Sequence, residues 1–384
     1  MDEIERAQQK AFDAVLRNAL AVERNNRGLV AEMNDVVGNA GRSLGMELLE
    51  RLDNLTPGEL RTLSRYRSGQ RVDRLPTRVQ GVVKFLDEWA ASLGTTIMST
   101  WQDGAIEFTQ AESDFIVDLM QETLVDAPTA AISAAAVYKQ AMETPALGIF
   151  IEDALKDAGS DTKARVISRI REGVSQGETN DQIVRALRGT KSMNYSDGVL
   201  KTTRNNLQTI VRTGRTHLSN MAYDETYLAL GVEQVVFVAT IDGRTTLRCS
   251  DLDSDVFDVG SNYPRPPLHY GCRSVIAPYF GGRIAGNRPY VKAFQPIQRI
   301  PKDKRPDGMI GQVRASTSMT DFLKRSDNAA FARQYFGPTR YKLFQEGKIS
   351  IGQMIRADGT RYTIAELRQQ HAKDFREVFG SGIG

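Results

Sequence analysis

Both cysteines of this 384-residue chain lie in one short loop, close to one of its three histidines. Cys249 begins the group, and His269 and Cys272 close it as a His-x-x-Cys pair. Thiolate and imidazole groups are the usual ligands of zinc, and zinc sites often place two ligands on one tight turn. A fourth ligand would come from water or from a loop aspartate, for which Asp242, Asp251 and Asp253 are the choices. Our candidate metal ligands are therefore Cys249, His269, Cys272 and Asp251.

Two other roles fit the same cysteines. They are 23 positions apart and can form a disulfide if the loop brings their α carbons together. Such a bond would not last in a reducing cytoplasm but would persist outside the cell. Buried cysteines also pack as small apolar groups. The residues leave all three roles open, and we predict no cofactor, with zinc as the alternative.

The acidic residues of the loop invite comparison with a calcium site. Asp251, Asp253 and Asp255 alternate as the first ligands of an EF-hand do. The sixth position of that loop requires glycine and the twelfth glutamate, whereas this chain has Val256 and Asn262 there. The sequence excludes an EF-hand and leaves a looser cation site open.

Signals for catalysis are weak. None of the histidines, His217, His269 and His371, lies beside a serine or cysteine in a nucleophile-elbow context. No P-loop or dinucleotide fingerprint occurs. His217 falls on the apolar side of its helix next to Leu218, which favours a core histidine. We predict a protein that is not an enzyme; the alternative is a metal-dependent nuclease or hydrolase built on the cysteine and histidine loop.

Composition sets the class of protein. Apolar residues make up 41% and charged residues 25%, as in a soluble globular protein, and the length suits two or three domains. The start is charged, and no apolar run is long enough to cross a bilayer, so we expect no signal peptide and no membrane partner. So few cysteines indicate synthesis in a reducing cytoplasm.

Positive charge gathers toward the C-terminus. Residues 280–384 hold 19 Lys or Arg against 9 Asp or Glu, while the whole chain has 50 against 47. A basic region on an acidic body suits a polyanion or an acidic protein face, and equally a solvated surface. The candidate DNA or partner contacts in this region are Lys302, Lys304 and Arg305.

A second basic group lies far upstream, in an arginine-rich segment. Its members are Arg61, Arg65, Arg67, Arg71, Arg74 and Arg78, with Asp73 as the only acidic residue among them. Arginines at this density can bind phosphates, hold acidic residues of a neighbouring subunit, or form salt bridges within a helical bundle.

The elements that position these groups are mainly helices. Leucines four positions apart at 44, 48 and 52 are typical of the helical region expected over 1–149, with Pro57 and Pro76 at helix starts or breaks. Thr179 and Gln182 predict a capping box, and a further helix follows over 202–230.

Strands are expected on both sides of the cysteine loop. The β-branched run 232–240 predicts one strand, and 274–280 predicts a second. The fold class is α+β, mainly α. The expected regions are a helical N-terminal half over 1–149, a small α/β core over 150–280 and a basic C-terminal extension over 281–384.

The C-terminal extension is expected to begin without regular structure. Prolines space out basic residues over 283–320, which predicts a linker or a surface arm. Two short helices follow around Gly337 and Pro338, and one helix runs over 363–380, where Thr363 and Glu366 predict a capping box.

The order of these elements resembles the core of the phage Mu F-like minor head proteins, a head-morphogenesis family of tailed phages. The resemblance covers about 150–280, with the helix IVRTGRTHLSNMAYDETYLALG, a strand, D-x-R-T-x-x-x-C and P-P-x-H-x-x-C-R. The matching positions are Arg212, Thr213, Asp242, Arg244, Thr245, Cys249, Leu252, Asp253, Phe257, Pro267, His269, Cys272 and Arg273. Thr246 and Ser274 stand where many members have further cysteines.

The resemblance implies a structural virion protein, made in the host cytoplasm and placed inside the capsid near the portal. It implies roles in head assembly, DNA packaging or ejection, and the portal protein as partner. The major capsid or scaffolding protein and non-specific double-stranded DNA are further expected partners. A toxin or effector that carries the same core is the alternative.

The two missing thiols weaken a closed zinc site and leave the loop to polar contacts. Arg244 is therefore predicted to pair with an acidic residue of the loop, and Asp253 to cap a backbone amide.

Overall fold

The computed structural model describes residues 3–67, 69–124, 130–193 and 197–380, which form two compact units. The sheet unit comprises residues 1–21, 110–133 and 219–384, and the helical unit comprises residues 22–109 and 134–218. Both units combine segments that are distant in sequence, so they cut across the three consecutive regions expected above. Those regions stay a prediction. None of the described helices is both long and apolar enough to span a membrane.

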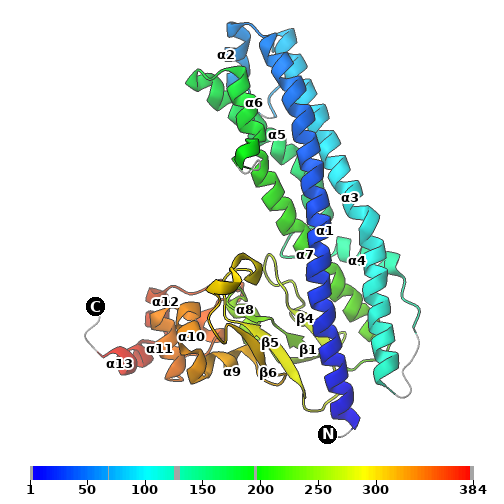
Figure 1. Cartoon of the computed structure of the whole chain (residues 1–384), viewed down its shortest axis with the longest axis vertical. Helices are drawn as coiled ribbons and strands as arrows, with labels where there is room; N and C mark the ends of the chain where they lie inside the picture. The colour runs from blue at the N-terminus through cyan, green and yellow to red at the C-terminus, as the bar shows by residue number, and fades with distance from the viewer. Residues whose placement is uncertain (1–2, 68, 125–129, 194–196, 381–384) are drawn as a thin grey trace. The chain divides into compact units, whose positions relative to one another are not determined.

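Long helices build the helical unit. They are α1 (Glu3–Asp53), α2 (Pro57–Arg65), α3 (Thr77–Thr123), α4 (Ala134–Glu143), α5 (Ile151–Gln176), α6 (Asn180–Arg188) and α7 (Leu200–Ala229), of which α1, α3 and α7 continue into the sheet unit. Leu44, Leu48 and Leu52 of α1 are buried, as their spacing predicts. Within the unit α1 and α3 run side by side (Figure 1), and Trp89 Nε1 donates to the carbonyl of Ala40 at 2.9 Å. The predicted helical character of the N-terminal half is confirmed, while its bounds as a separate region stay a prediction.

Local sequence signals define where these helices begin. Pro57 occupies the first turn of α2, and α3 starts directly after Pro76. The predicted capping box of α6 is confirmed, because the Thr179 side chain accepts from Gln182 N and Gln182 Oε1 accepts from Thr179 N at 2.8 Å. The helix expected over 202–230 is α7.

Two small sheets lie in the sheet unit, and the first surrounds the predicted strands. Its order is β3 (Val256–Asp258), β1 (Gln234–Val238), β4 (Val275–Tyr279), and both pairings are antiparallel. In the register Val236 faces Ala277 and Val238 faces Val275. Both predicted strands are confirmed, and the cysteine loop connects them.

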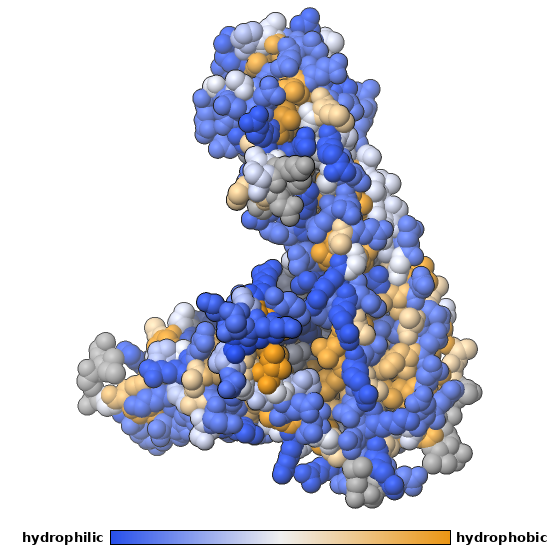
Figure 2. All heavy atoms as spheres, in the orientation of Figure 1, coloured by the Kyte–Doolittle hydropathy of each residue, from blue (hydrophilic) through white to orange (hydrophobic). Residues whose placement is uncertain are grey.

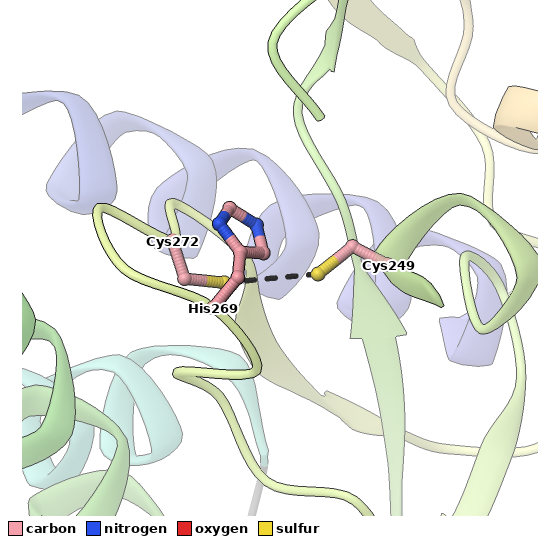
Figure 3. Close-up of side chains that lie close together, drawn as sticks. All are labelled: Cys249, His269 and Cys272. Atoms are coloured by element: carbon pink, nitrogen blue, oxygen red, sulfur yellow. Dashed lines mark hydrogen bonds between the residues drawn. The ribbon is translucent and has the colours of Figure 1, made fainter. Parts of the chain in front are cut away.

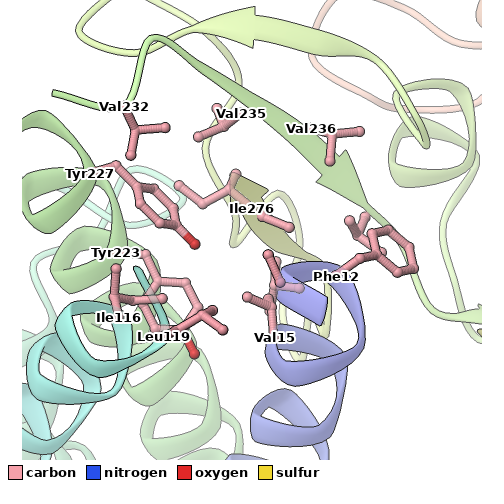
Figure 4. Packing of buried hydrophobic residues seen from close by; sticks show 14 of the residues in the cluster. Phe12, Val15, Ile116, Leu119, Tyr223, Tyr227, Val232, Val235, Val236 and Ile276 are labelled. Atoms are coloured by element: carbon pink, nitrogen blue, oxygen red, sulfur yellow. The ribbon is translucent and has the colours of Figure 1, made fainter. Parts of the chain in front are cut away.

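The core of the sheet unit joins segments that are far apart in sequence. Phe12 and Val15 of α1, Ile116 and Leu119 of α3, and Tyr223 and Tyr227 of α7 pack against Val235, Val236 and Ile276 of β1 and β4 (Figure 4). Burial of these apolar side chains holds the first turns of α1, the last turns of α3 and the last turns of α7 against the first sheet.

The second sheet corrects the linker expected over 283–320. Its order is β2 (Ile241–Asp242), β5 (Asn287–Val291), β6 (Ile310–Arg314), with β5 parallel to β2 and antiparallel to β6. The prolines suggested an irregular arm, but β2 pairs only with Tyr290 and Val291, so Pro289 has a strand neighbour on one side only. Strand pairing with a distant segment outweighed the local composition.

Short helices complete the sheet unit. They are α8 (Leu247–Asp251), α9 (Met319–Lys324), α10 (Ala329–Phe336), α11 (Pro338–Gln345), α12 (Ile364–Gln370) and α13 (Ala372–Phe379), and the last five gather beside β5 and β6 (Figure 1). Their buried side chains, such as Phe322 and Phe344, share a core with Ile241 of β2. The single helix expected over 363–380 is instead two helices, because the chain leaves helical geometry at His371 (φ −121°, ψ 41°). The capping box of Thr363 and Glu366 is confirmed.

Candidate functional site

The cysteine and histidine loop brings its three candidate ligands together. One ligand atom from each of Cys249, His269 and Cys272 lies within 4.8 Å of the other two. The sulfurs of Cys249 and Cys272 are 3.8 Å apart and face each other, and the His269 imidazole lies beside them (Figure 3). Both cysteines are buried free thiols. Among the described residues, this is the one group of histidine, cysteine and acidic side chains close enough to hold a metal ion.

Two structural elements position the group. Helix α8 carries Cys249, and the Thr246 hydroxyl caps this helix by accepting from Cys249 N at 3.5 Å. A tight turn carries the other two residues, closed by a hydrogen bond from Cys272 N to the carbonyl of His269 at 3.0 Å. Phe237 of β1 and Ala239, directly after this strand, form one buried apolar cluster with both cysteines. Burial removes the thiols from water, so any ion bound here would lie in a dry environment.

The two thiols perturb each other. The hydrogen bond to Cys272, together with burial, raises the pKa of Cys249. The same hydrogen bond and the neighbouring His269 lower the pKa of Cys272. The contact with Cys272 also outweighs burial at His269 and raises the pKa of its imidazole. Cys272 is thus the thiol whose surroundings favour a thiolate, beside an imidazole that can hydrogen-bond to it.

Asp251 does not join this group, which corrects its assignment as a fourth ligand. Its carboxylate faces the backbone of Gly352, where an added Cβ would lie 2.6 Å from Asp251 Oδ2. Burial raises the pKa of this carboxyl group. Its orientation toward a C-terminal segment could not be read from the loop sequence. The looser cation site of Asp251, Asp253 and Asp255 is not formed, because Asp253 is engaged in a buried ion pair.

Asp242 organises the turn that precedes α8. Its carboxylate accepts two hydrogen bonds from Arg273, at 2.6 and 2.8 Å, and one from Arg244 Nη2 at 3.1 Å. It also accepts from the backbone amides of Arg244 and Thr245, at 2.9 and 3.1 Å. Burial alone would raise the pKa of Asp242, but these arginines hold it below its ordinary value. The predicted pairing of Arg244 with an acidic residue of the loop is confirmed.

A second ion pair, between Asp253 and Arg288, is almost completely buried. Arg288 Nη1 and Nη2 donate to the two oxygens of Asp253 at 3.0 and 3.1 Å, and the two side chains are 2% and 0% exposed. Asp253 also accepts from the backbone amides of Ala239 and Met319, both at 2.7 Å. The predicted capping role of Asp253 is confirmed. Its partner Arg288 was missed, because it lies in the segment that reads as a linker.

The C-terminal helices directly contact the loop 242–274 that carries the cysteines and His269, called the motif loop below. The hydroxyl of Tyr335 on α10 lies 2.6 Å from that of Ser250 and donates to the carbonyl of Thr245 at 2.8 Å. No local signal identifies this contact, since 85 positions separate the two hydroxyl-bearing residues. The loop is therefore held on both sides, by β1 and by the segment after residue 281.

Two of the motif residues, Arg212 and Thr213, belong to the helical unit. Thr213 on α7 is buried, and Arg212 beside it is half-buried. His217 is also buried, and its Nε2 lies 2.8 Å from the carbonyl of Ala141. The interpretation of His217 as a core histidine with its polar atom satisfied is confirmed.

The candidate basic contacts differ in how free their side chains are. Lys302 and Lys304 are exposed, whereas Arg305 is half-buried and donates to the carbonyls of Ile297 and Ile300, at 2.9 Å each. Arg305 therefore closes its own loop, which leaves the two lysines as the better candidates for contact. In the face drawn in Figure 2, the region of the C-terminal helices shows hydrophilic residues mixed with smaller hydrophobic patches.

The upstream arginines all lie on the surface. Arg71 pairs with Asp73 at 2.7 Å, and Arg78 lies 3.9 Å from Glu59. Within the described part of the chain the other four make no ion pair; they are Arg61, Arg65, Arg67 and Arg74. Salt bridges within the bundle therefore account for two of the six residues.

Comparison with known proteins gives one match. Residues 164–277 match a family model described as Phage Mu protein F like protein. The matched segment runs from α5 to β4 and contains Cys249, His269 and Cys272 together with Asp242 and Asp253. No curated protein and no solved structure matches the chain.

Proposed function

Residues 164–277 match the Phage Mu protein F like family model, and from this match we propose that the chain is a minor head protein of a tailed phage. In this proposal it lies inside the capsid next to the portal and acts in head assembly, DNA packaging or ejection. The family match carries the proposal, since the family is one of phage head proteins. The portal protein and packaged DNA are its proposed partners, with the major capsid or scaffolding protein as further candidates.

The state of the motif loop supports a structural role. The carboxylates of Asp242 and Asp253 are each bound by arginine and by two backbone amides. Groups engaged in this way hold a turn in shape and are poorly placed to accept a substrate proton. A loop fixed from several sides suits a protein that must keep one shape within a particle.

Exposed positive charge supports a contact with packaged DNA. Lys302 and Lys304 lie exposed between β5 and β6, and the four arginines in and after α2 that make no ion pair with any described residue form a second exposed basic group. Lysine and arginine side chains bind phosphates without reading base sequence, and such binding weakens as salt rises because counterions compete.

DNA binding by the full-length chain is the first test. We expect binding to duplexes of unrelated sequence, with log affinity falling linearly against log salt. Lys302→Gln combined with Lys304→Gln should weaken binding and reduce the slope by about 1–2, since each lost phosphate contact removes about 0.9. The matched control is Lys84→Gln with Lys139→Gln, which removes the same charge from exposed lysines that pair with Glu88 and Glu143. Absence of binding at low salt would remove DNA from the proposed partners.

Location in the particle is the second test. Mass spectrometry of purified virions should detect the chain, and the portal protein of the same phage should co-purify with it after co-expression. A chain absent from virions and unable to hold the portal would contradict the proposal as a whole, whatever its affinity for DNA.

A further inference from the structure

The spacing of the two sulfurs matches that of a metal-bound pair. Two thiolates bound to one tetrahedral zinc at about 2.3 Å each lie about 3.8 Å apart. Cys249 Sγ and Cys272 Sγ are 3.8 Å apart in this structure. A disulfide requires about 2.05 Å between the same atoms. The loop therefore holds its thiols at the separation that a shared ion needs.

His269 is held as metal-binding histidines usually are. Its Nδ1 lies 3.1 Å from the carbonyl of Tyr270. A hydrogen bond from one ring nitrogen to a backbone carbonyl fixes the orientation of the ring and leaves the other nitrogen free to bind a metal. With Nδ1 engaged by this carbonyl, Nε2 is the ring nitrogen left to bind an ion, and one ring nitrogen of His269 lies within 4.8 Å of both sulfurs.

We propose that Cys249, His269 and Cys272 bind one zinc ion that connects α8 to the turn 269–272. The chain supplies three ligands, so the fourth comes from water or from Ser274, whose side chain is a hydrogen-bond partner of the Cys249 thiol. Thiolate and imidazole ligands favour zinc over magnesium or calcium, which prefer oxygen. This inference goes beyond the proposed function, which requires no metal.

The surroundings indicate a structural ion. Phe237 and Ala239 enclose the sulfurs, with Leu252 and Leu268 packed against them, and both cysteines are almost completely buried. An ion in this place would join the five-residue helix α8 directly to the turn 269–272, in addition to the ion pair of Arg273 with Asp242. Zinc would then stabilise the closed end of the loop between β1 and β4.

Metal content is the direct test. Full-length protein purified with zinc present and then freed of loose ions should contain close to one zinc per chain by elemental analysis. Cobalt in place of zinc should give the absorption of a thiolate-bound tetrahedral ion. Cys272→Ser and His269→Gln should each weaken zinc binding at least about tenfold. The matched control His371→Gln changes a histidine of the C-terminal helices and should retain the ion.

Chelation of wild-type protein tests the proposal without a substitution that could itself disturb folding. Chelation should lower the thermal unfolding midpoint and make both thiols reactive toward a thiol reagent, and zinc, but not magnesium, should reverse both changes. Protein that takes up no zinc overturns the proposal. An intact mass two hydrogens below that of the fully reduced chain would identify a disulfide and would overturn it as well. Neither result bears on virion content or on DNA binding, so the proposed function is judged separately.

Discussion

Asp242 and Asp253 are the two carboxylates on which the motif loop depends. Each is buried, and each combines an arginine partner with backbone amides. A buried charge is tolerated only when its partners are complete, so the loss of one partner costs far more than the loss of a surface pair. Stability at this site therefore rests on a few polar contacts.

Substitution of Asp253 should destabilise the sheet unit strongly. Asp253→Ala leaves Arg288 buried without a counter-charge and two backbone amides without an acceptor. We expect the free energy of unfolding to fall by about 3–5 kcal/mol, measured by urea titration. The control Asp327→Ala removes the partner of Arg325 from an exposed pair at 2.8 Å and should unfold close to wild type. Equal effects of the two substitutions would contradict this account of the buried pair.

His217 should make stability depend on pH. Burial lowers the pKa of its imidazole below the ordinary value near 6.5, so the folded chain keeps it neutral while the unfolded chain binds a proton. The free energy of unfolding is therefore unaffected by His217 above pH 6.5. It decreases as the pH falls below 6.5, by up to about 1.4 kcal/mol at pH 5.5. The measurement is the free energy of unfolding at pH 7.5 and 5.5.

A variant that cannot titrate isolates this contribution. His217→Gln keeps a donor for the carbonyl of Ala141 but carries no charge at either pH. Its loss of stability between pH 7.5 and 5.5 should be smaller than that of wild type. An identical pH dependence in both proteins would show that His217 is not responsible.

Four of the described helices begin at a short sequence signal, the capping box. Capping boxes begin α2, α6, α9 and α12, each with a threonine or serine and an acidic or amide residue three positions later. The reciprocal hydrogen bonds satisfy amides that no helical carbonyl can reach. Such signals act within four residues, so they work equally well in both compact units.

Loss of one cap should therefore have a measurable local cost. Thr179→Ala removes the acceptor of Gln182 N at the start of α6. We expect about 1 kcal/mol of destabilisation by urea titration, and little change for Thr179→Ser, which keeps the hydroxyl. Equal stability of Thr179→Ala and wild type would mean that packing alone defines the start of α6.

The segment after residue 281 is an integral part of the sheet unit. It supplies β5 and β6 to the second sheet, Arg288 to the buried ion pair and Tyr335 to the contact with Ser250. The basic C-terminal region expected from the charge distribution therefore shares its core with the rest of the unit. Truncation of this segment would therefore remove its structural contacts together with its positive charge.

Deletion of residues 281–384 should disrupt the motif loop. The deletion leaves Asp253 buried without Arg288 and uncovers Ile241 and Leu247, which pack in the C-terminal core. We expect the truncated chain to lose cooperative thermal unfolding and to become sensitive to protease between residues 242 and 274. Full-length protein with Lys302→Gln and Lys304→Gln should resist protease like wild type. A truncated chain that keeps the wild-type midpoint would contradict an integral role for this segment.

Much of the secondary structure and the grouping of the cysteines with His269 could be predicted from residues close together in the sequence. The leucine spacing of α1, the capping boxes at Thr179 and Thr363, the β-branched strand β1 and the grouping of Cys249 with His269 and Cys272 all follow from residues close together in sequence or from one short motif. The family resemblance rests on the same motif positions and agrees with the match over 164–277.

Tertiary structure decided the partners of the buried charges and the place of the C-terminal segment. Arg288 reaches Asp253 across 35 positions and Tyr335 reaches Ser250 across 85, and β5 pairs with a two-residue strand nearly 50 positions before it. Asp251 turned toward Gly352 rather than toward the cysteines for the same reason. Helix caps and periodicity report the energy of neighbouring residues, whereas ion pairs and strand pairing depend on which distant segments the folded core brings into contact.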